Sequence, residues 1–144
     1  MQRILEEYNS FFLNPDPSFE VRIANNNYYL WNCVLKGPPG SLYEGGRFRF
    51  TLNIPSNYPN TPPSIIFQNK PFHCDIRENG YVCWELQAKW SPSWRIRGIF
   101  GCLIGLLFNP VPHPGDRYEP DLLYCTNRPR YEQRAREITN LNRS

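Results

Sequence analysis

The stretch RFRFTLNI, residues 47–54, alternates strictly between polar and apolar side chains. Successive side chains of a β-strand point to opposite faces of a sheet, so this stretch predicts a strand. Its two phenylalanines, Leu52 and Ile54 would then face a hydrophobic core. A half-buried strand of this kind needs partners on both edges and a layer of other elements on its apolar face.

Three neighbouring segments also predict strands. Residues 18–23 alternate in the same way, residues 28–35 are apolar on both faces and indicate a more central strand, and residues 64–67 form a short fourth candidate. The connections are too short for helical crossovers, which favours an antiparallel meander. The connection Tyr58-Pro59-Asn60-Thr61-Pro62-Pro63 is stiffened by its three prolines and could contain a cis peptide bond.

Helical patterns lie on either side of these strands. Residues 1–13 place their apolar side chains on one helical face, and residues 95–108 are apolar nearly all round, which predicts a central, buried helix. A short helix is expected from residue 119 to about 124, and Asn127 is expected to cap a final helix. Gly98, Gly101 and Gly105 each cost roughly 1 kcal/mol in a helix, so we expect them to allow a close approach to the sheet.

The predicted order is an N-terminal helix, a four-stranded antiparallel meander, an irregular active-site loop and then three helices. This is an α+β architecture with the helices segregated against one sheet. The chain has 144 residues, a length that suits one domain spanning residues 1–144.

The charge is weak and scattered. The formal net charge is +3, and the only basic cluster, in residues 128–143, is expected to be a solvated helix face, so no nucleic acid is predicted as a partner. The longest apolar run, residues 96–108, contains an arginine and three glycines and is too short to cross a bilayer, so no membrane partner is expected either.

The chain has five cysteines, an odd number that excludes complete internal pairing. Met1 leads directly into charged residues and no signal peptide is recognisable. We therefore expect free thiols in a reducing compartment, the cytoplasm, the nucleus or both. Cys33 and Cys102 fall in a predicted strand and a predicted helix and are expected to be buried structural residues.

The loop PFHCDIRENGYVCW, residues 71–84, is rich in reactive groups. Gly80 permits a sharp turn just before Cys83, which would present the thiol rather than bury it. Four interpretations are open: a structural thiol, a zinc ligand, the nucleophile of a cysteine hydrolase, or an acyl carrier. Zinc is disfavoured because the chain has no Cys-x-x-Cys pair, so no metal and no cofactor is predicted.

The two catalytic interpretations differ in what they require. A hydrolase needs a base beside the thiol, for which His73 and His113 are the only histidines. An acyl carrier needs an exposed thiol, a donor for the oxyanion and a means of orienting the attacking amine, but no histidine base.

The motifs of the chain favour the acyl carrier, because in order and spacing it resembles the ubiquitin-conjugating enzyme family over almost its full length. The matching pieces are Tyr43-Glu44-Gly45-Gly46, Tyr58-Pro59-x-x-Pro62-Pro63, Phe72-His73, Gly80-x-x-Cys83, Trp90-Ser91-Pro92, Leu106-Leu107-x-x-Pro110 and Tyr124-x-x-Asn127-Arg128-x-x-Tyr131. The resemblance implies that Cys83 accepts ubiquitin or a ubiquitin-like protein as a thioester from an activating enzyme. Transfer to a substrate lysine or to a ligase would follow. The alternative is a non-catalytic adaptor that binds modifier or ligase without being charged.

The resemblance also assigns roles within the loop. The family motif His-Pro-Asn is His73-Cys74-Asp75 here, so His73 is expected to structure the loop and Asp75 stands at the asparagine position. An ionised carboxylate has no donor for an oxyanion. Asp75 could act when protonated, could bind the incoming lysine, or could be replaced in this role by backbone amides; otherwise the protein has weak lysine reactivity. We expect an active enzyme with altered aminolysis.

Two further acids are candidates for orienting the lysine. Glu85 lies two residues after Cys83, where many relatives carry an acid. The later gate position of the family falls on Pro114, with His113 and Asp116 nearby; Asp116 either substitutes for the gate residue or is a surface acid.

The surface that contacts ligases and the activating enzyme in the family is also altered. Its counterparts here are Arg3, Asn60, Pro92, Ser93 and Trp94. Asn60 stands where a phenylalanine is common, and the first helix balances Arg3 with acids, so a poorer fit to standard partners is predicted. The protein is expected to be a monomer.

Overall fold

The sheet predicted from the alternating stretches is present in the computed structural model, which describes residues 1–84 and 86–143. Its four strands are antiparallel and follow one another in sequence order, which confirms the meander. The strands are β1 (Phe19–Ala24), β2 (Asn27–Lys36), β3 (Arg47–Asn53) and β4 (Ser64–Phe67).

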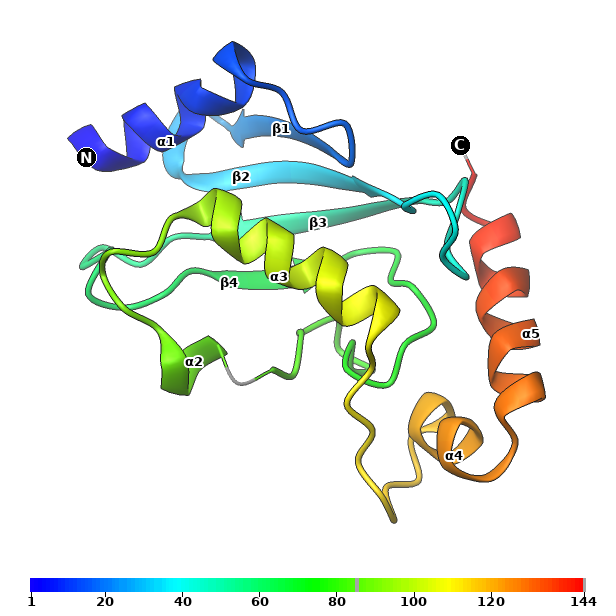
Figure 1. Cartoon of the computed structure of the whole chain (residues 1–144). Coiled ribbons are helices and arrows are strands. Elements are labelled where there is room, and N and C mark those ends of the chain that lie inside the picture. The colour runs from blue at the N-terminus through cyan, green and yellow to red at the C-terminus, as the bar shows by residue number, and fades with distance from the viewer. Residues whose placement is uncertain (85, 144) are drawn as a thin grey trace.

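One face of the sheet carries the core. Cys33 of β2 is paired with Phe50 of β3, and both side chains are buried with Phe48 and Leu52. The helix α3 (Ile96–Phe108) runs across this face in Figure 1. Phe100 of α3 stacks on Phe19 with ring centroids 4.4 Å apart. The alternation in the sequence therefore predicted both the strands and the side of the sheet that is covered.

The other helices lie around the sheet. Helix α1 (Gln2–Leu13) lies near β1 and β2, whereas α4 (Glu119–Thr126) and α5 (Arg128–Asn140) stand at the far end from the N-terminus (Figure 1). The Asn127 side chain accepts a hydrogen bond of 3.2 Å from the backbone N–H of Arg130, which confirms the predicted cap. A single turn, α2 (Leu86–Lys89), was not predicted.

Helix α3 departs from the prediction. Gly98, Gly101 and Gly105 face open space, because a Cβ atom built on any of them meets no atom within 4 Å. Cys102 is exposed as well, so its predicted burial is wrong, while Cys33 is buried as predicted. Most of the residues exposed on α3 are small and cost little to expose, although Phe108 at its end is 47% exposed. The buried stripe consists of large side chains, namely Ile96, Ile99, Phe100, Leu103 and Leu107. Among the described residues, no helix is long and apolar enough to span a bilayer.

The proline-rich connection is fixed in place near α1. The peptide bond between Tyr58 and Pro59 is cis, a conformation that the proline-rich sequence permits. The indole N–H of Trp90 donates to the carbonyl oxygen of Pro59 at 2.7 Å, and the rings of Tyr58 and Trp90 lie 6.0 Å apart. The segment after Trp90 is thereby held beside the connection between β3 and β4.

Candidate active site

The loop between β4 and α2 contains a small hairpin that ends at Cys83. Ile76 and Val82 form an antiparallel bridge, and Gly80 makes the turn with a φ of +88°. A Cβ atom on Gly80 would lie 2.3 Å from the carbonyl oxygen of Phe67. The glycine thus supplies both a conformation and a close backbone approach that other residues cannot. The hairpin holds Cys83 just beyond the edge of the sheet.

The Cys83 thiol is presented to solvent beside a groove. Its backbone N–H donates to the carbonyl oxygen of Asp75 at 2.6 Å, while its side chain is exposed. The adjoining groove has a volume of about 760 Å³ and extends along the open face of α3 past Cys102 and Gly105, with Trp84 and Trp94 also lining it. We call this hollow the Cys83 groove. The small residues of α3 are what keep it open.

His73 is buried and uses both ring nitrogens. Its Nδ1 accepts a hydrogen bond of 2.9 Å from the backbone N–H of Asp75, and its Nε2 is therefore the donor to the Leu106 carbonyl oxygen at 2.8 Å. Burial lowers the pKa of His73 to about 4, so the ring is neutral near pH 7. His73, Cys74 and Asp75 lie close enough together to suggest a metal site, but neither imidazole nitrogen has a lone pair left for an ion.

Asp75 is also buried, with only one of its carboxyl oxygens satisfied. Oδ2 accepts from the backbone N–H of Val111 at 2.7 Å, whereas Oδ1 is buried without a hydrogen-bond partner. Burial raises the pKa of this carboxyl group, and the Val111 hydrogen bond opposes the rise. The unpaired Oδ1 lies 4.0 Å from Nε2 of His113. Asp75 is thus beside the site, and its protonation state is sensitive to its surroundings.

A second histidine, His113, lies directly on the thiol. Its Nε2 is 3.4 Å from Sγ of Cys83, and its Nδ1 is 2.9 Å from Oδ1 of Asp121. Asp121 is fully buried in the first turn of α4. A nucleophile, a base and a group that orients the base are therefore in contact.

The sequence did not predict this arrangement. His113 is there one of two candidate hydrolase bases and a neighbour of the gate position, and Asp121 simply falls in the short helix expected from residue 119. The available signal was weak: a histidine one residue from the gate position, in a proline-rich segment thirty residues beyond Cys83.

The two other acids predicted to orient the lysine are Asp116 and Glu85. Asp116 is paired with Arg77 at 2.7 Å and accepts from the backbone N–H of Tyr118 at 2.9 Å; that backbone hydrogen bond, followed by Arg77, lowers its pKa. Arg77 also binds Asp121 at 2.5 Å, so its charge is directed to these two acids. Glu85 lies outside the described residues.

The five residues predicted to contact partners lie together at the α1 end, and we call them the Arg3 cluster. The guanidinium of Arg3 donates to the carbonyl oxygens of Pro92 and Trp94. The rings of Trp94 and Trp90 are 5.9 Å apart, and Asn60 and Ser93 are exposed next to them. Three segments distant in the sequence therefore form one surface.

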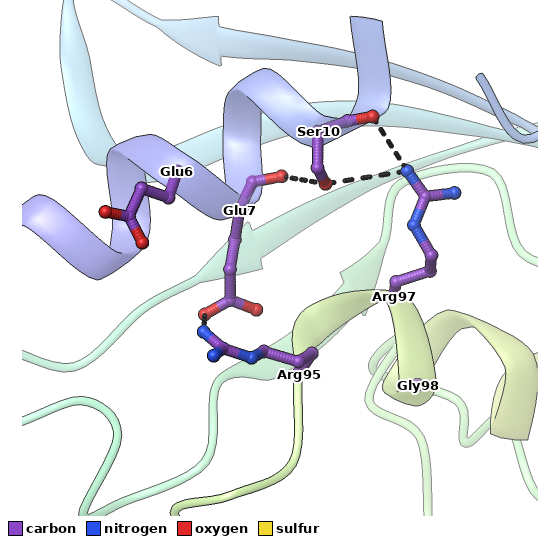
Figure 2. Close-up of a pocket in the computed structure, with 6 residues that line it drawn as sticks. All are labelled: Glu6, Glu7, Ser10, Arg95, Arg97 and Gly98. Carbon is purple, nitrogen blue, oxygen red and sulfur yellow. Dashed lines mark hydrogen bonds and ion pairs between the residues drawn. The ribbon is translucent and has the colours of Figure 1, made fainter. Parts of the chain in front are cut away.

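A second hollow, shown in Figure 2, lies between α1 and the start of α3. The charged groups in it are used to join the two helices: Arg97 donates to the carbonyl oxygen of Ser10 at 3.0 Å, and Arg95 approaches Glu7 to 4.0 Å. Among the described residues, the other side chains that line this hollow are those of Glu6 and Ser10, next to Gly98.

An antiparallel meander covered by a central helix, with an exposed thiol at the end of the following loop, is typical of an enzyme that carries acyl groups on cysteine. Comparison with known proteins agrees. Residues 3–139 match the family model for "Ubiquitin-conjugating enzyme". The chain is 34% identical over 141 residues to the "Probable ubiquitin-conjugating enzyme E2 31" of Arabidopsis thaliana, covering 96% of this chain and 90% of the relative. The chain therefore belongs to the ubiquitin-conjugating enzyme family, and the predicted fold and class of transferase are confirmed.

Proposed function

We propose that this protein accepts ubiquitin or a ubiquitin-like protein on Cys83 from an activating enzyme and passes it to a substrate lysine or a ligase. In the first step the Cys83 sulfur displaces the sulfur of the activating enzyme from the C-terminal carbonyl carbon of the modifier. In the second step the acceptor displaces Cys83. The observation that best supports this function is the exposed thiol of Cys83 at the mouth of the groove along α3.

The groove suits an extended chain terminus. Gly105 and Cys102 leave a shallow floor beside the thiol, and Trp84 and Trp94 supply apolar walls. A flexible modifier tail could lie there with its backbone close to α3. His73 and its hydrogen bonds would hold the loop in place while Cys83 is loaded and unloaded.

The Arg3 cluster is the surface we propose for the activating enzyme and the ligase. It has exposed polar and aromatic groups on a rigid support, since Arg3 and Trp90 fix the underlying segments. Exposed aromatic side chains with fixed neighbours are favourable binding anchors. Free thiols, both buried and exposed, suit work in the reducing cytoplasm or nucleus.

The first test is charging. Purified protein is mixed with activating enzyme, ATP and a panel of modifiers, and adducts are separated with and without reductant. We expect a reductant-sensitive adduct that disappears in Cys83→Ala and persists in the matched control Cys125→Ala, because Cys125 is exposed but lies in α4 away from the groove. If no modifier forms an adduct while non-covalent binding survives Cys83→Ala, the adaptor alternative is correct instead.

A further inference from the structure

The contact between Cys83, His113 and Asp121 has a defined proton arrangement. A carboxylate only accepts hydrogen bonds, so the nitrogen of His113 that lies 2.9 Å from Asp121 must carry the hydrogen. The same Oδ1 also accepts from the backbone N–H of His113 at 2.9 Å. His113 is therefore held by Asp121 through both its backbone and its ring. With the hydrogen on Nδ1, the lone pair of Nε2 faces Sγ of Cys83.

Arg77 acts on this tautomer in two ways. Its Nη1 donates to Oδ2 of Asp121 at 2.5 Å, which keeps Asp121 an acceptor, but the same nitrogen also lies 3.3 Å from Nδ1, where a guanidinium can only donate. The shorter contact of 2.9 Å between Nδ1 and Asp121 favours the hydrogen on Nδ1. On the thiol side the unpaired Oδ1 of Asp75 is 4.0 Å from Nε2, where it would attract an imidazolium. Within the part of the chain that the structure describes, Asp116 is the remaining acid near the ring, and it is paired with Arg77.

The ring is also accessible. The side chain of His113 is 34% exposed, whereas that of Asp121 is fully buried. A proton taken up at Nε2 can therefore pass to solvent, while the group that orients the ring is kept from water. This combination of a buried orienting acid and a half-exposed ring beside a nucleophile is what general base catalysis requires.

We propose that His113, oriented by Asp121, is the base that takes the acceptor's proton during transfer from Cys83, and that it extends the acceptors to hydroxyl groups. The inference rests on the proposed thioester on Cys83. The acceptor oxygen attacks the thioester carbonyl carbon as its proton moves to Nε2 of His113. The tetrahedral intermediate then breaks its carbon–sulfur bond, and the Cys83 thiolate regains the proton from His113. An oxyester and a free thiol result.

A base matters more for a hydroxyl than for an amine. An alcohol is almost entirely un-ionised near neutral pH, and its oxygen is a poor nucleophile until the proton begins to leave. A positioned base contributes about 10²–10⁴-fold to such a step. Serine and threonine side chains are therefore the acceptors whose modification should depend most on His113.

The test is single-turnover discharge of charged enzyme to peptides that offer either one lysine or one serine. Charging is done with the activating enzyme and, separately, with ubiquitin supplied as a small-molecule thioester, and peptide mapping follows the fraction linked to Cys83. We expect wild-type enzyme to form a hydroxylamine-sensitive oxyester on the serine peptide, and His113→Gln to lower that rate about 100-fold. We also measure the rate of discharge to the serine peptide as a function of pH. We expect the profile of the wild-type enzyme to contain a step that the profile of His113→Gln lacks.

Asp121→Asn tests the positioning role. Its matched control is Glu119→Gln, an exposed acid in the same helical turn. We expect Asp121→Asn to weaken the step in the pH profile and to lower the rate of discharge to the serine peptide about tenfold or more. Glu119→Gln should keep the wild-type profile and rate. Thermal unfolding of each variant shows whether the fold is retained. A purely structural change would slow discharge to all acceptors without altering the shape of the pH profile, whereas loss of the base would alter that shape.

The outcomes are distinct. If the activating enzyme never charges Cys83 but the small-molecule thioester does, the proposed function fails and the inference can still be measured. If His113→Gln discharges at the wild-type rate with an unaltered profile, His113 is not the base. If wild-type enzyme modifies lysine but never serine, the assignment of hydroxyl acceptors is wrong.

Discussion

Two buried carboxylates, Glu7 at the α1 end and Asp121 at the α4 end, are built in nearly the same way. Each accepts hydrogen bonds from one arginine, one backbone N–H and one further side chain. Glu7 accepts from Arg3 at 2.9 Å, from the N–H of Ile96 at 2.7 Å and from the Tyr58 hydroxyl at 2.7 Å. Asp121 accepts from Arg77 at 2.5 Å and from both the backbone and the ring of His113 at 2.9 Å.

The difference lies in the third partner. Burial and the neighbouring Glu7 raise the pKa of Tyr58 well beyond its usual value, so the hydroxyl keeps its proton and the network ends there. The imidazole of His113 instead presents a second nitrogen to Cys83. One carboxylate thus fixes three segments of the fold, and the other orients a group that can exchange a proton. The same local design becomes catalytic only when its last member can change its charge state beside a nucleophile.

The largest effect should come from breaking the Glu7 network. Glu7→Ala removes the carboxylate that neutralises Arg3 and that accepts from the N–H of Ile96. We expect a loss of about 3 kcal/mol in the free energy of unfolding, measured with urea. The discharge rate from charged Cys83 should not change. Glu6→Ala, an exposed acid on the same helix, is the control and should stay within about 0.5 kcal/mol of wild type. A slowed discharge in Glu7→Ala would remove the distinction between the two carboxylates.

An intermediate effect is expected from acid, through His73 in the catalytic loop. Burial lowers its pKa to about 4 in the folded protein, against about 6.5 in an unfolded chain. The unfolded state therefore binds a proton that the native state excludes, and stability falls as the pH drops below about 6.5. We expect a loss of about 2 kcal/mol between pH 6.5 and pH 5.

Because His73 is remote from Glu7, the same loss should appear in the Glu7→Ala variant. Urea titrations of both proteins at each pH provide the measurement. A free energy of unfolding that is flat across this interval would mean that His73 is protonated in the folded protein.

The smallest effect concerns Asp75. Its pKa is raised by burial, so the stability it contributes is present at acid pH and is lost as the pH rises and the carboxyl group ionises. Asp75→Asn should therefore be more stable than wild type at pH 7 by about 1 kcal/mol, with a smaller advantage at acid pH. The amide also offers an N–H where Oδ1 is now unpaired, so discharge to free lysine should be a few-fold faster.

Glu78→Gln, an exposed acid of the same loop, is the control for Asp75→Asn and should match wild type in both stability and rate. Slower discharge in Asp75→Asn would give Asp75 a positive role, such as holding the incoming lysine or stabilising the His113 imidazolium.

The sequence predicted the fold well because the pattern of each element is local. The alternation of polar and apolar side chains predicted strands. Asn127 predicted a helix cap and Gly80 a sharp turn, and the structure confirms both. The exposure of α3 was mispredicted because small residues add to an apolar pattern without adding much surface that must be buried. The burial of Glu7 was predictable from the sequence, because Glu7 lies on the same helical face as Ile4, Tyr8 and Phe11, the buried face of α1.

The site was predictable only in part. Cys83 was found because the turn that presents it is adjacent in the sequence. His113 and Asp121 come from a proline-rich segment and the start of a later helix, and only the packing of these elements brings them to the thiol. Contacts of this kind leave no periodicity or spacing in a single sequence.

The most direct test of the account is the chemistry of the adduct on residue 83. Wild-type protein and Cys83→Ser are charged in parallel with the activating enzyme, and each product is treated with reductant and then with hydroxylamine. The account predicts a thioester on wild type that reductant removes, and an oxyester on Cys83→Ser that resists reductant but not hydroxylamine. A reductant-sensitive adduct that remains in Cys83→Ser would place the carrier thiol elsewhere and contradict the account.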